Sequence, residues 1–158
     1  MELEKEDEPF LWEMLYHALY VPSGSEPFPR EIVRDPAIAR YVGGWGKPGD
    51  LGFGAIEEVA GQPVGAVWIR LFSKQNQGYG FVAEDCPELS IAVLPQYRNR
   101  GFGTHLLQHI IAECARLYSS LSLSVSNDNP AARLYERLGF MTVATHGSSQ
   151  TMVKRLVE

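Results

Sequence analysis

Apolar positions along this chain follow two periods, one of about 3.6 residues and one of about two, which are the periods of a helix and of a strand. Leu11, Leu15 and Leu19 recur at the longer period and predict a helix near the start of the chain. The apolar side chains that follow Gly103 also fall on one face and predict a second, longer helix. The predicted helices cover residues 10–20, 31–41 with an interruption near Pro36, 103–118 and 131–138.

Shorter apolar runs bounded by turn residues predict strands between these helices. Residues 121–125 alternate apolar and polar side chains most regularly, and Gly61-Gln62-Pro63 indicates a tight hairpin between two of the strands. Strands and helices mixed in this order predict a mixed α/β or α+β domain that spans the 158 residues. The predicted strands cover residues 53–60, 64–72, 89–93, 121–125, 140–145 and 151–157.

Composition excludes several classes of protein. The net charge of −5, without a broad basic surplus, argues against nucleic acid as a partner. Cys86 and Cys114 show no CxxC spacing, so neither a disulfide framework nor a metal site is expected. The acidic start of the chain lacks the apolar core of a signal peptide, and no apolar run approaches the roughly 18 residues of a membrane span. We therefore expect a cytoplasmic protein that binds neither membrane nor nucleic acid.

One short segment carries the strongest chemical signal. Residues 93–104, VLPQYRNRGFGT, follow an apolar strand and lead into the longer amphipathic helix. Gly101 and Gly103 let the backbone approach a ligand closely, and the helix begins with free N–H groups and the positive end of its dipole. Arg98 and Arg100 add a local positive charge to an acidic chain. The segment therefore predicts a site for an anion, most naturally the phosphate of a cofactor.

Two familiar phosphate-binding motifs do not fit this segment. A dinucleotide-binding turn needs the spacing GxGxxG, and Leu106 stands where the third glycine would be. A Walker A loop needs Gly-Lys-Ser/Thr after four spacer residues, and no lysine lies near Gly101. The remaining alternative is a tight turn from strand to helix with a purely structural purpose.

A second motif lies further along the chain. In residues 124–140, SVSNDNPAARLYERLGF, an asparagine-containing turn runs into the pattern L-Y-x-x-x-G-F. The first segment contains Arg98-Asn99-Arg100-Gly101-Phe102-Gly103, which has the form R/Q-x-x-G-x-G/A. With both motifs in this order, the chain resembles the GNAT superfamily of acetyl-CoA-dependent N-acetyltransferases. The resemblance covers residues 88–145, and the N-terminal part matches only in its order of a helix followed by strands.

This resemblance implies a mostly antiparallel central sheet with helices on both faces, and direct attack of an amine on acetyl-CoA in a ternary complex. It implies that backbone N–H groups of the glycine turn bind the pyrophosphate and that one strand presents main-chain groups to the pantetheine arm. The N–H of Val93 would then face the thioester oxygen. No metal is implied. The residues expected to bind acetyl-CoA are Ile91, Ala92, Val93, Arg98, Asn99, Arg100, Gly101, Phe102, Gly103, Thr104, Asn129, Ala132 and Tyr135.

The resemblance also suggests two catalytic residues. Tyr135 holds the place of the motif's tyrosine, and a phenol with a pKa of about 10 stays protonated at neutral pH and can protonate the departing thiolate. Packing at a junction of helix and strand is the alternative for this tyrosine. Glu88, at the start of a predicted strand, is the candidate general base, although a glutamate there is equally ordinary on a surface. Asn129 either binds the cosubstrate or caps the following helix.

The acceptor is left open, because the N-terminal half of such proteins usually shapes its site. Tyr16, Tyr20 and Trp68 are candidate pocket residues, although large aromatic side chains usually build the core. We expect a primary amine of a small molecule or of a peptide as acceptor. Members of this superfamily often dimerise, which leaves a homodimer open. The alternatives to this enzyme are a catalytically silent domain that binds or senses acyl-CoA, and an enzyme that uses another acyl-CoA.

Overall fold

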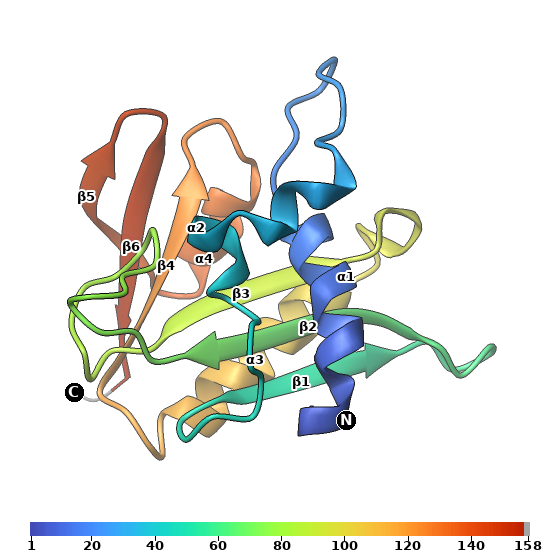
Figure 1. Ribbon diagram of the computed structural model, residues 1–158, viewed down its shortest axis with the longest axis horizontal. Helices are drawn as coiled ribbons and strands as arrows, with labels where there is room; N and C mark the ends of the chain where they lie inside the picture. The colour runs from blue at the N-terminus through green and yellow to red at the C-terminus, as the bar shows by residue number, and fades with distance from the viewer. Residues whose placement is uncertain (157–158) are drawn as a thin grey trace.

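The computed structural model of the protein describes residues 1–156 and shows a six-stranded sheet with helices on both faces (Figure 1). The order of the strands is β1-β2-β3-β4-β6-β5, and every neighbouring pair except β3 and β4 is antiparallel. The prediction of a mixed, mostly antiparallel sheet flanked by helices is therefore confirmed. The strands are β1 (Leu51–Ile56), β2 (Pro63–Arg70), β3 (Glu88–Val93), β4 (Ser120–Ser126), β5 (Met141–His146) and β6 (Ser149–Arg155).

Helices lie on both sides of this sheet. In the view of Figure 1, α1 and α2 lie in front of the sheet and α3 lies behind it. None of the helices within residues 1–156 is long and apolar enough to cross a membrane. The helical segments are η1 (Lys5–Asp7), α1 (Glu8–Ala18), η2 (Arg30–Arg34), α2 (Pro36–Ala39), η3 (Pro95–Tyr97), α3 (Phe102–Cys114) and α4 (Ala131–Arg137).

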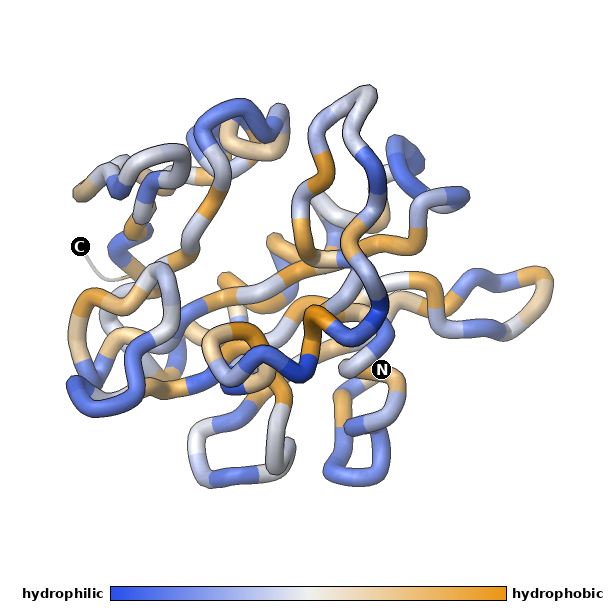
Figure 2. The backbone as a smooth tube through the Cα atoms, turned by 45° about the horizontal axis from the view of Figure 1, so that its top comes forward, coloured by the Kyte–Doolittle hydropathy of each residue, from blue (hydrophilic) through white to orange (hydrophobic). Residues whose placement is uncertain are grey.

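Each face of the sheet has its own hydrophobic core, because successive side chains of a strand point to opposite faces. In β2, Val67 and Ile69 pack against α3 and α4, whereas Ala66 and Trp68 pack against α1 and α2. Figure 2 shows the consequence: the strands through the middle of the molecule are largely hydrophobic and the loops at its rim are largely hydrophilic. A sheet covered on both faces holds its central strands rigidly, and the candidate site is built on these strands.

The parallel pair β3 and β4 is joined at one end only. Glu88 and Ser122 form its single register pair within the described residues, and the Ser122 N–H donates to the Pro87 carbonyl at 3.0 Å. The chain reaches β4 from β3 through α3, which is the crossover connection that parallel strands require. Beyond this pair the two strands diverge and their facing edges carry backbone N–H and C=O groups that no neighbouring strand engages. This opening positions the candidate site.

The helices form where the apolar periodicity predicts them, but their ends differ. α1 begins two residues earlier than expected, with Pro9 in its first turn, where a proline costs no hydrogen bond. The interruption expected near Pro36 in the helix over residues 31–41 is confirmed: η2 and α2 are separated at Asp35, because proline disfavours helical backbone in the residue before it. The Asp35 carboxylate then accepts the N–H of Ala37 and starts α2. α3 ends at Cys114 rather than at residue 118.

The predicted strand over residues 53–60 is too long at its end. The Glu57 carboxylate accepts the N–H groups of Val59 and Ala60 and folds this segment into a turn, so the connection to β2 is wider than Gly61-Gln62-Pro63. The ends of the other observed strands lie within two residues of the predicted ones. For the last strand the predicted end, Val157, lies outside the described residues.

Candidate active site

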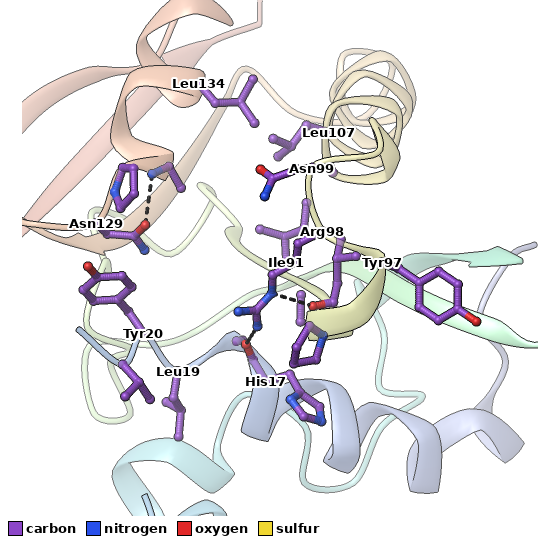
Figure 3. A pocket seen from close by; sticks show the side chains of 18 of the residues that line it. His17, Leu19, Tyr20, Ile91, Tyr97, Arg98, Asn99, Leu107, Asn129 and Leu134 are labelled. Carbon is purple, nitrogen blue, oxygen red and sulfur yellow. Dashed lines mark hydrogen bonds between the residues drawn. The ribbon is translucent and has the colours of Figure 1, made fainter. Parts of the chain in front are cut away.

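Two adjoining cavities lie where β3 and β4 diverge. The larger has a volume of about 840 Å³ and is bounded by the glycine turn, the start of α3, the start of α4 and the segment that follows α1 (Figure 3). Most residues expected to bind acetyl-CoA meet here, although they come from separate parts of the chain. Those that line this cavity are Ile91, Ala92, Val93, Arg98, Asn99, Gly101, Gly103, Thr104, Asn129 and Tyr135.

The glycine turn owes its shape to two residues with positive φ. Asn99 has a φ of 63° and Gly101 a φ of 88°, which is the left-handed region that asparagine tolerates and glycine adopts freely. The turn delivers the chain to α3 with the first N–H groups of that helix unpaired, as at any helix start. Gly103 lines the cavity, and a Cβ at that position would meet no atom within 4 Å. Backbone N–H groups and open space therefore face a ligand together.

Charge distinguishes the larger cavity from the protein as a whole. Its lining includes His17, Arg98 and Arg137, and no aspartate or glutamate among the described residues lines it. The chain carries a net charge of −5, so the basic character is local. Together with the positive dipole end of α3, this lining favours an anion.

The two arginines of the turn have different surroundings. The Arg98 guanidinium donates from Nε to the Val93 carbonyl at 3.0 Å and from Nη2 to the His17 carbonyl at 3.2 Å, so it joins β3 to the end of α1 (Figure 3). Arg100 instead lies over the Tyr97 ring, with its Cζ 5.3 Å from the ring centroid, and does not line the cavity. The turn directs the Arg100 side chain outward, so of its two arginines Arg98 adds its charge to the cavity lining and Arg100 does not.

Phe102 and Ala132 also fail to line the cavity. Ala132 is buried in the core beneath α4, and the Phe102 ring packs edge-on against Tyr97 at a centroid distance of 6.2 Å. Both helices turn these side chains away from the cavity, so Ala132 is not placed to contact the cosubstrate there, whereas the expected contact of Phe102 is through its backbone N–H. Asn129 serves as a cap: its Oδ1 accepts the Ala131 N–H at 2.9 Å at the start of α4, while the residue also lines the cavity.

The free edge of β3 carries the backbone groups that the resemblance implied. The Leu94 N–H, just after β3, donates to the carbonyl of Val64 in β2. Because backbone groups alternate between the two sides of a strand, the N–H groups of Ile91 and Val93 point the other way, toward the opening. The bond from Arg98 to the Val93 carbonyl agrees with this direction. The Val93 N–H is thus available to a ligand in the cavity.

Tyr135, on α4, lines both cavities and stands where they meet. The side chain is largely buried in the core under the sheet, with its ring edge-on to Phe140 at a centroid distance of 6.1 Å. Burial raises the pKa of Tyr135 to about 12, since the charged phenolate is disfavoured away from water. The hydroxyl therefore keeps its proton at neutral pH, as a proton donor must.

The smaller cavity, of about 310 Å³, lies on the α1 side of the same opening. Leu15 and Leu19 form an apolar wall, and the hydroxyls of serines from three strands provide polar groups. Glu88 is the single charged residue among the described residues that line it. The lining serines are Ser90, Ser124, Ser126 and Ser149.

Glu88 lines the smaller cavity and is buried, with 3% of its surface exposed. Its Oε2 accepts the Tyr41 hydroxyl at 2.5 Å and the Gly80 N–H at 3.1 Å. Burial raises the pKa of the Glu88 carboxyl to about 7, although both hydrogen bonds favour the charged form. A carboxyl with this pKa exchanges a proton near neutrality, which suits a general base better than an ordinary surface glutamate.

Sequence reasoning missed Tyr41 and the segment 78–80. Tyr41 lies 47 residues before Glu88 in the chain, and its hydroxyl also accepts the Tyr79 N–H at 2.7 Å. A Cβ at Gly78 would lie 2.3 Å from the Glu88 Oε1, so this glycine is required by close packing. No motif or spacing marks these residues, because only the folded sheet brings them to Glu88.

The three aromatic candidates for the acceptor pocket differ in whether they line a cavity. Tyr16 lines the larger cavity, where its hydroxyl donates to the Phe28 carbonyl at 2.6 Å. Tyr20 lines both cavities, and its hydroxyl donates to the Asp128 carbonyl at 3.1 Å. Trp68 lines neither cavity: it is 1% exposed and its Nε1–H donates to the Tyr41 carbonyl at 3.0 Å. The prediction for Trp68 is wrong, because alternation along β2 turns it into the core under α1.

Comparison with protein families and curated proteins gives a consistent result. The profile of the Acetyltransferase (GNAT) family matches residues 10–140. An N-alpha-acetyltransferase of Sulfurisphaera tokodaii is 39% identical over 95 residues, which make up 56% of this chain and 56% of that protein. The human Cysteine-rich protein 2-binding protein is 34% identical over 77 residues, 46% of this chain and 10% of that protein. The chain thus spans about half the length of the first relative and a tenth of the second.

Solved structures share the fold over nearly the whole chain. A putative acetyltransferase, yncA, from Salmonella typhimurium, solved with its cofactor acetyl-CoA, is 20% identical with a TM-score of 0.69, covering 100% of this chain and 93% of that one. The PaiA N-acetyltransferase of Thermoplasma acidophilum, in complex with coenzyme A, is 18% identical with a TM-score of 0.64, covering 97% and 95%. At these identities the likeness shows a common architecture.

Proposed function

The chain belongs to the GNAT acetyltransferase family, and from this premise we propose that it transfers the acetyl group of acetyl-CoA to a primary amine. The observation that carries the proposal is the meeting of two oppositely charged cavities at Tyr135. One is lined by basic side chains and a helix start, and the other by a single carboxylate. An anionic cosubstrate and a cationic amine are thereby drawn to opposite sides of one proton donor.

The residues of the larger cavity fit the cosubstrate. Unpaired N–H groups at the start of α3 and the space over Gly103 suit its pyrophosphate, and the free N–H groups of Ile91 and Val93 suit the amides of its pantetheine arm. Acetyl-CoA supplies the activated acetyl group. Two solved members of this fold hold acetyl-CoA or coenzyme A, which supports the same use here.

Three groups of the chain divide the chemistry. The Val93 N–H faces the position where negative charge develops on the thioester oxygen. Tyr135 donates a proton to the departing thiolate, since its raised pKa keeps it protonated. Glu88 receives the proton that the acceptor ammonium must lose before the amine can attack.

The lining of the smaller cavity narrows the class of acceptor. A single carboxylate suits one ammonium group, and no cationic side chain among the described lining residues is available to pair with a carboxylate on the acceptor. The acceptor is therefore an amine on an uncharged scaffold, such as the N-terminal α-amine of a polypeptide. The N-alpha-acetyltransferase that is 39% identical over 95 residues supports this choice.

Calorimetric titration with acetyl-CoA, coenzyme A and ATP tests the first half of the proposal. We expect acetyl-CoA and coenzyme A to bind and ATP not to bind. If neither acetyl-CoA nor coenzyme A binds, acetyl-CoA is not the cosubstrate of this protein, and the glycine turn has only a structural purpose.

Acetylation assays on matched acceptors test the second half. Alaninamide and alanine differ only in an amide against a carboxylate, and we expect alaninamide and alanine-initiated peptides to be acetylated much faster than free alanine. Spermidine, which carries several cations, serves as a further comparison. Preference for free alanine or for spermidine would contradict the assigned class of acceptor.

A further inference from the structure

Glu88 lines the smaller cavity, but its carboxylate is almost wholly enclosed, with 3% of the residue's surface exposed. Glu88 Oε2 is held by Tyr41 and by the Gly80 N–H, and Oε1 is buried without a hydrogen-bond partner among the described residues. Gly78 packs so closely against Oε1 that a Cβ there would lie 2.3 Å away. A general base enclosed in this way needs a group that connects it to the acceptor.

Tyr41 is the side chain in that position. It lines the smaller cavity, and its hydroxyl donates to Glu88 while it accepts the Tyr79 N–H at 2.7 Å. The hydroxyl oxygen carries two lone pairs and the Tyr79 N–H engages one of them, so the second can meet an amine or a water beside it. Burial holds the pKa of Tyr41 well above its usual range, so the tyrosine does not act as a base by itself.

The tyrosine is fixed by its neighbours on several sides. Its backbone carbonyl accepts the Trp68 Nε1–H at 3.0 Å, and its ring lies edge-on to Phe72 at a centroid distance of 5.2 Å. The Gly80 N–H independently anchors the carboxylate. Donor and acceptor are therefore held in contact before any substrate arrives, which removes the cost of orienting them.

From this geometry we infer that the Tyr41 hydroxyl relays the proton of the acceptor ammonium to Glu88. The hydroxyl oxygen takes a proton from the ammonium, directly or through one water, as its own proton passes to Glu88 Oε2. One N–H bond breaks, one O–H bond of Tyr41 is exchanged, and one O–H bond forms on Glu88. The ammonium becomes a neutral amine, the carboxylate becomes a carboxylic acid, and Tyr41 ends as the neutral phenol it was. The inference rests on the proposed function.

Tyr41→Phe tests the relay, because it removes one oxygen and keeps the ring packing. We expect kcat to fall at least about tenfold, because the proton transfer loses its carrier, and the dissociation constant of acetyl-CoA to stay within about twofold. Tyr118→Phe, which removes a hydroxyl from a tyrosine lining neither cavity, is the matched control.

The pH profile separates a relay from simple packing. Without the tyrosine hydroxyl, Glu88 loses a donor to its charged form, so the acidic limb of kcat/KM is expected to move to higher pH. The other titratable groups near Glu88 are Arg40, which favours its charged form, and Cys86, whose pKa is raised by burial so that the thiol stays neutral. Neither group is altered by the substitution.

A folded Tyr41→Phe enzyme with unchanged kcat and an unchanged acidic limb would overturn the relay. Should this variant not fold, a proton inventory on wild-type kcat/KM in mixtures of H₂O and D₂O decides: two protons in motion give a curved plot, and a linear plot overturns the relay. Wild-type protein that acetylates no amine would count against the proposed function itself. Wild-type turnover that Tyr41→Phe leaves intact counts against the relay alone.

Discussion

The two cavities of this protein are built in different ways. The larger depends mainly on backbone: the positive φ of Asn99 and Gly101 sets the turn, and the helix start and the free edge of β3 provide N–H groups. The smaller depends on side chains that meet from distant parts of the chain, above all Tyr41 and Glu88. A backbone site tolerates most side-chain substitutions, whereas a side-chain site is sensitive to the loss of a single atom.

The largest effect is expected where the two cavities meet. Tyr135→Phe removes the hydroxyl proposed to protonate the thiolate, and we expect turnover to fall by about 100-fold or more, the usual scale of a general acid. The dissociation constant of acetyl-CoA, measured by calorimetry, is expected to change by less than about twofold, because the ring still fills its place in the core. Unchanged turnover in a folded variant would make Tyr135 a packing residue.

Glu88→Gln tests the smaller cavity with a loss of charge at nearly constant shape. A general base acts in its ionised form, so wild-type kcat/KM is expected to rise with pH through the carboxyl pKa of about 7. The glutamine variant is expected to lose this limb and about 100-fold in kcat/KM at pH 8. Acetyl-CoA affinity serves as the internal control and is expected to stay the same. A variant that keeps the rise through pH 7 would place the titrating group elsewhere.

Substitution of Gly103 tests whether the ligand of the larger cavity lies against the backbone of the glycine turn. A Cβ there meets no protein atom within 4 Å, so Gly103→Ala is expected to leave folding and acetyl-CoA binding nearly unchanged. Gly103→Val projects further into the cavity, and we expect it to weaken acetyl-CoA binding about tenfold, which corresponds to about 1.4 kcal/mol. Calorimetry with both variants measures the difference. Equal affinity in the valine variant would show that the ligand does not approach this glycine.

The smallest effect is expected for the arginines of the turn. Arg98→Gln removes the hydrogen bonds to the Val93 and His17 carbonyls, so the free energy of unfolding is expected to fall by about 1 kcal/mol. Arg100→Gln, which removes only a contact with an exposed face of Tyr97, is expected to change it by less than about 0.5 kcal/mol. Urea denaturation of the two variants checks this order. The reverse order would mean that the Arg98 bonds contribute nothing to holding α1.

Sequence alone predicted the elements and the larger cavity because both depend on local rules. Apolar periodicity placed the ends of α1, α3 and α4 to within four residues, and the glycines and asparagines indicated where the chain reverses or starts a helix. The strand over residues 53–60 was predicted too long, since the Glu57 carboxylate competes with the ladder for backbone N–H groups. Even this error arises from one side chain whose preference for a turn is difficult to read from a pattern.

The residues around Glu88 were beyond such rules. Glu88 itself was a candidate, but its burial and raised pKa follow from Tyr41, Gly78 and Gly80, which reach it through the packing of α2 and the segment before β3 on the sheet. The same packing buried Trp68, and the turn's exit direction sent Arg100 outward.

The sequence by itself determined the strands, the helices, the glycine turn and the place of Tyr135 on α4, because periodicity and positive-φ residues act over a few neighbours. Only the tertiary structure decided which side chains meet at the carboxylate, which arginine joins α1 to β3 and which aromatic residue is buried. Those outcomes depend on strand register and on the divergence of β3 and β4. Both features result from contacts between residues that are far apart in the chain. A local sequence pattern does not describe contacts between distant residues, so the surroundings of Glu88 become visible only in the fold.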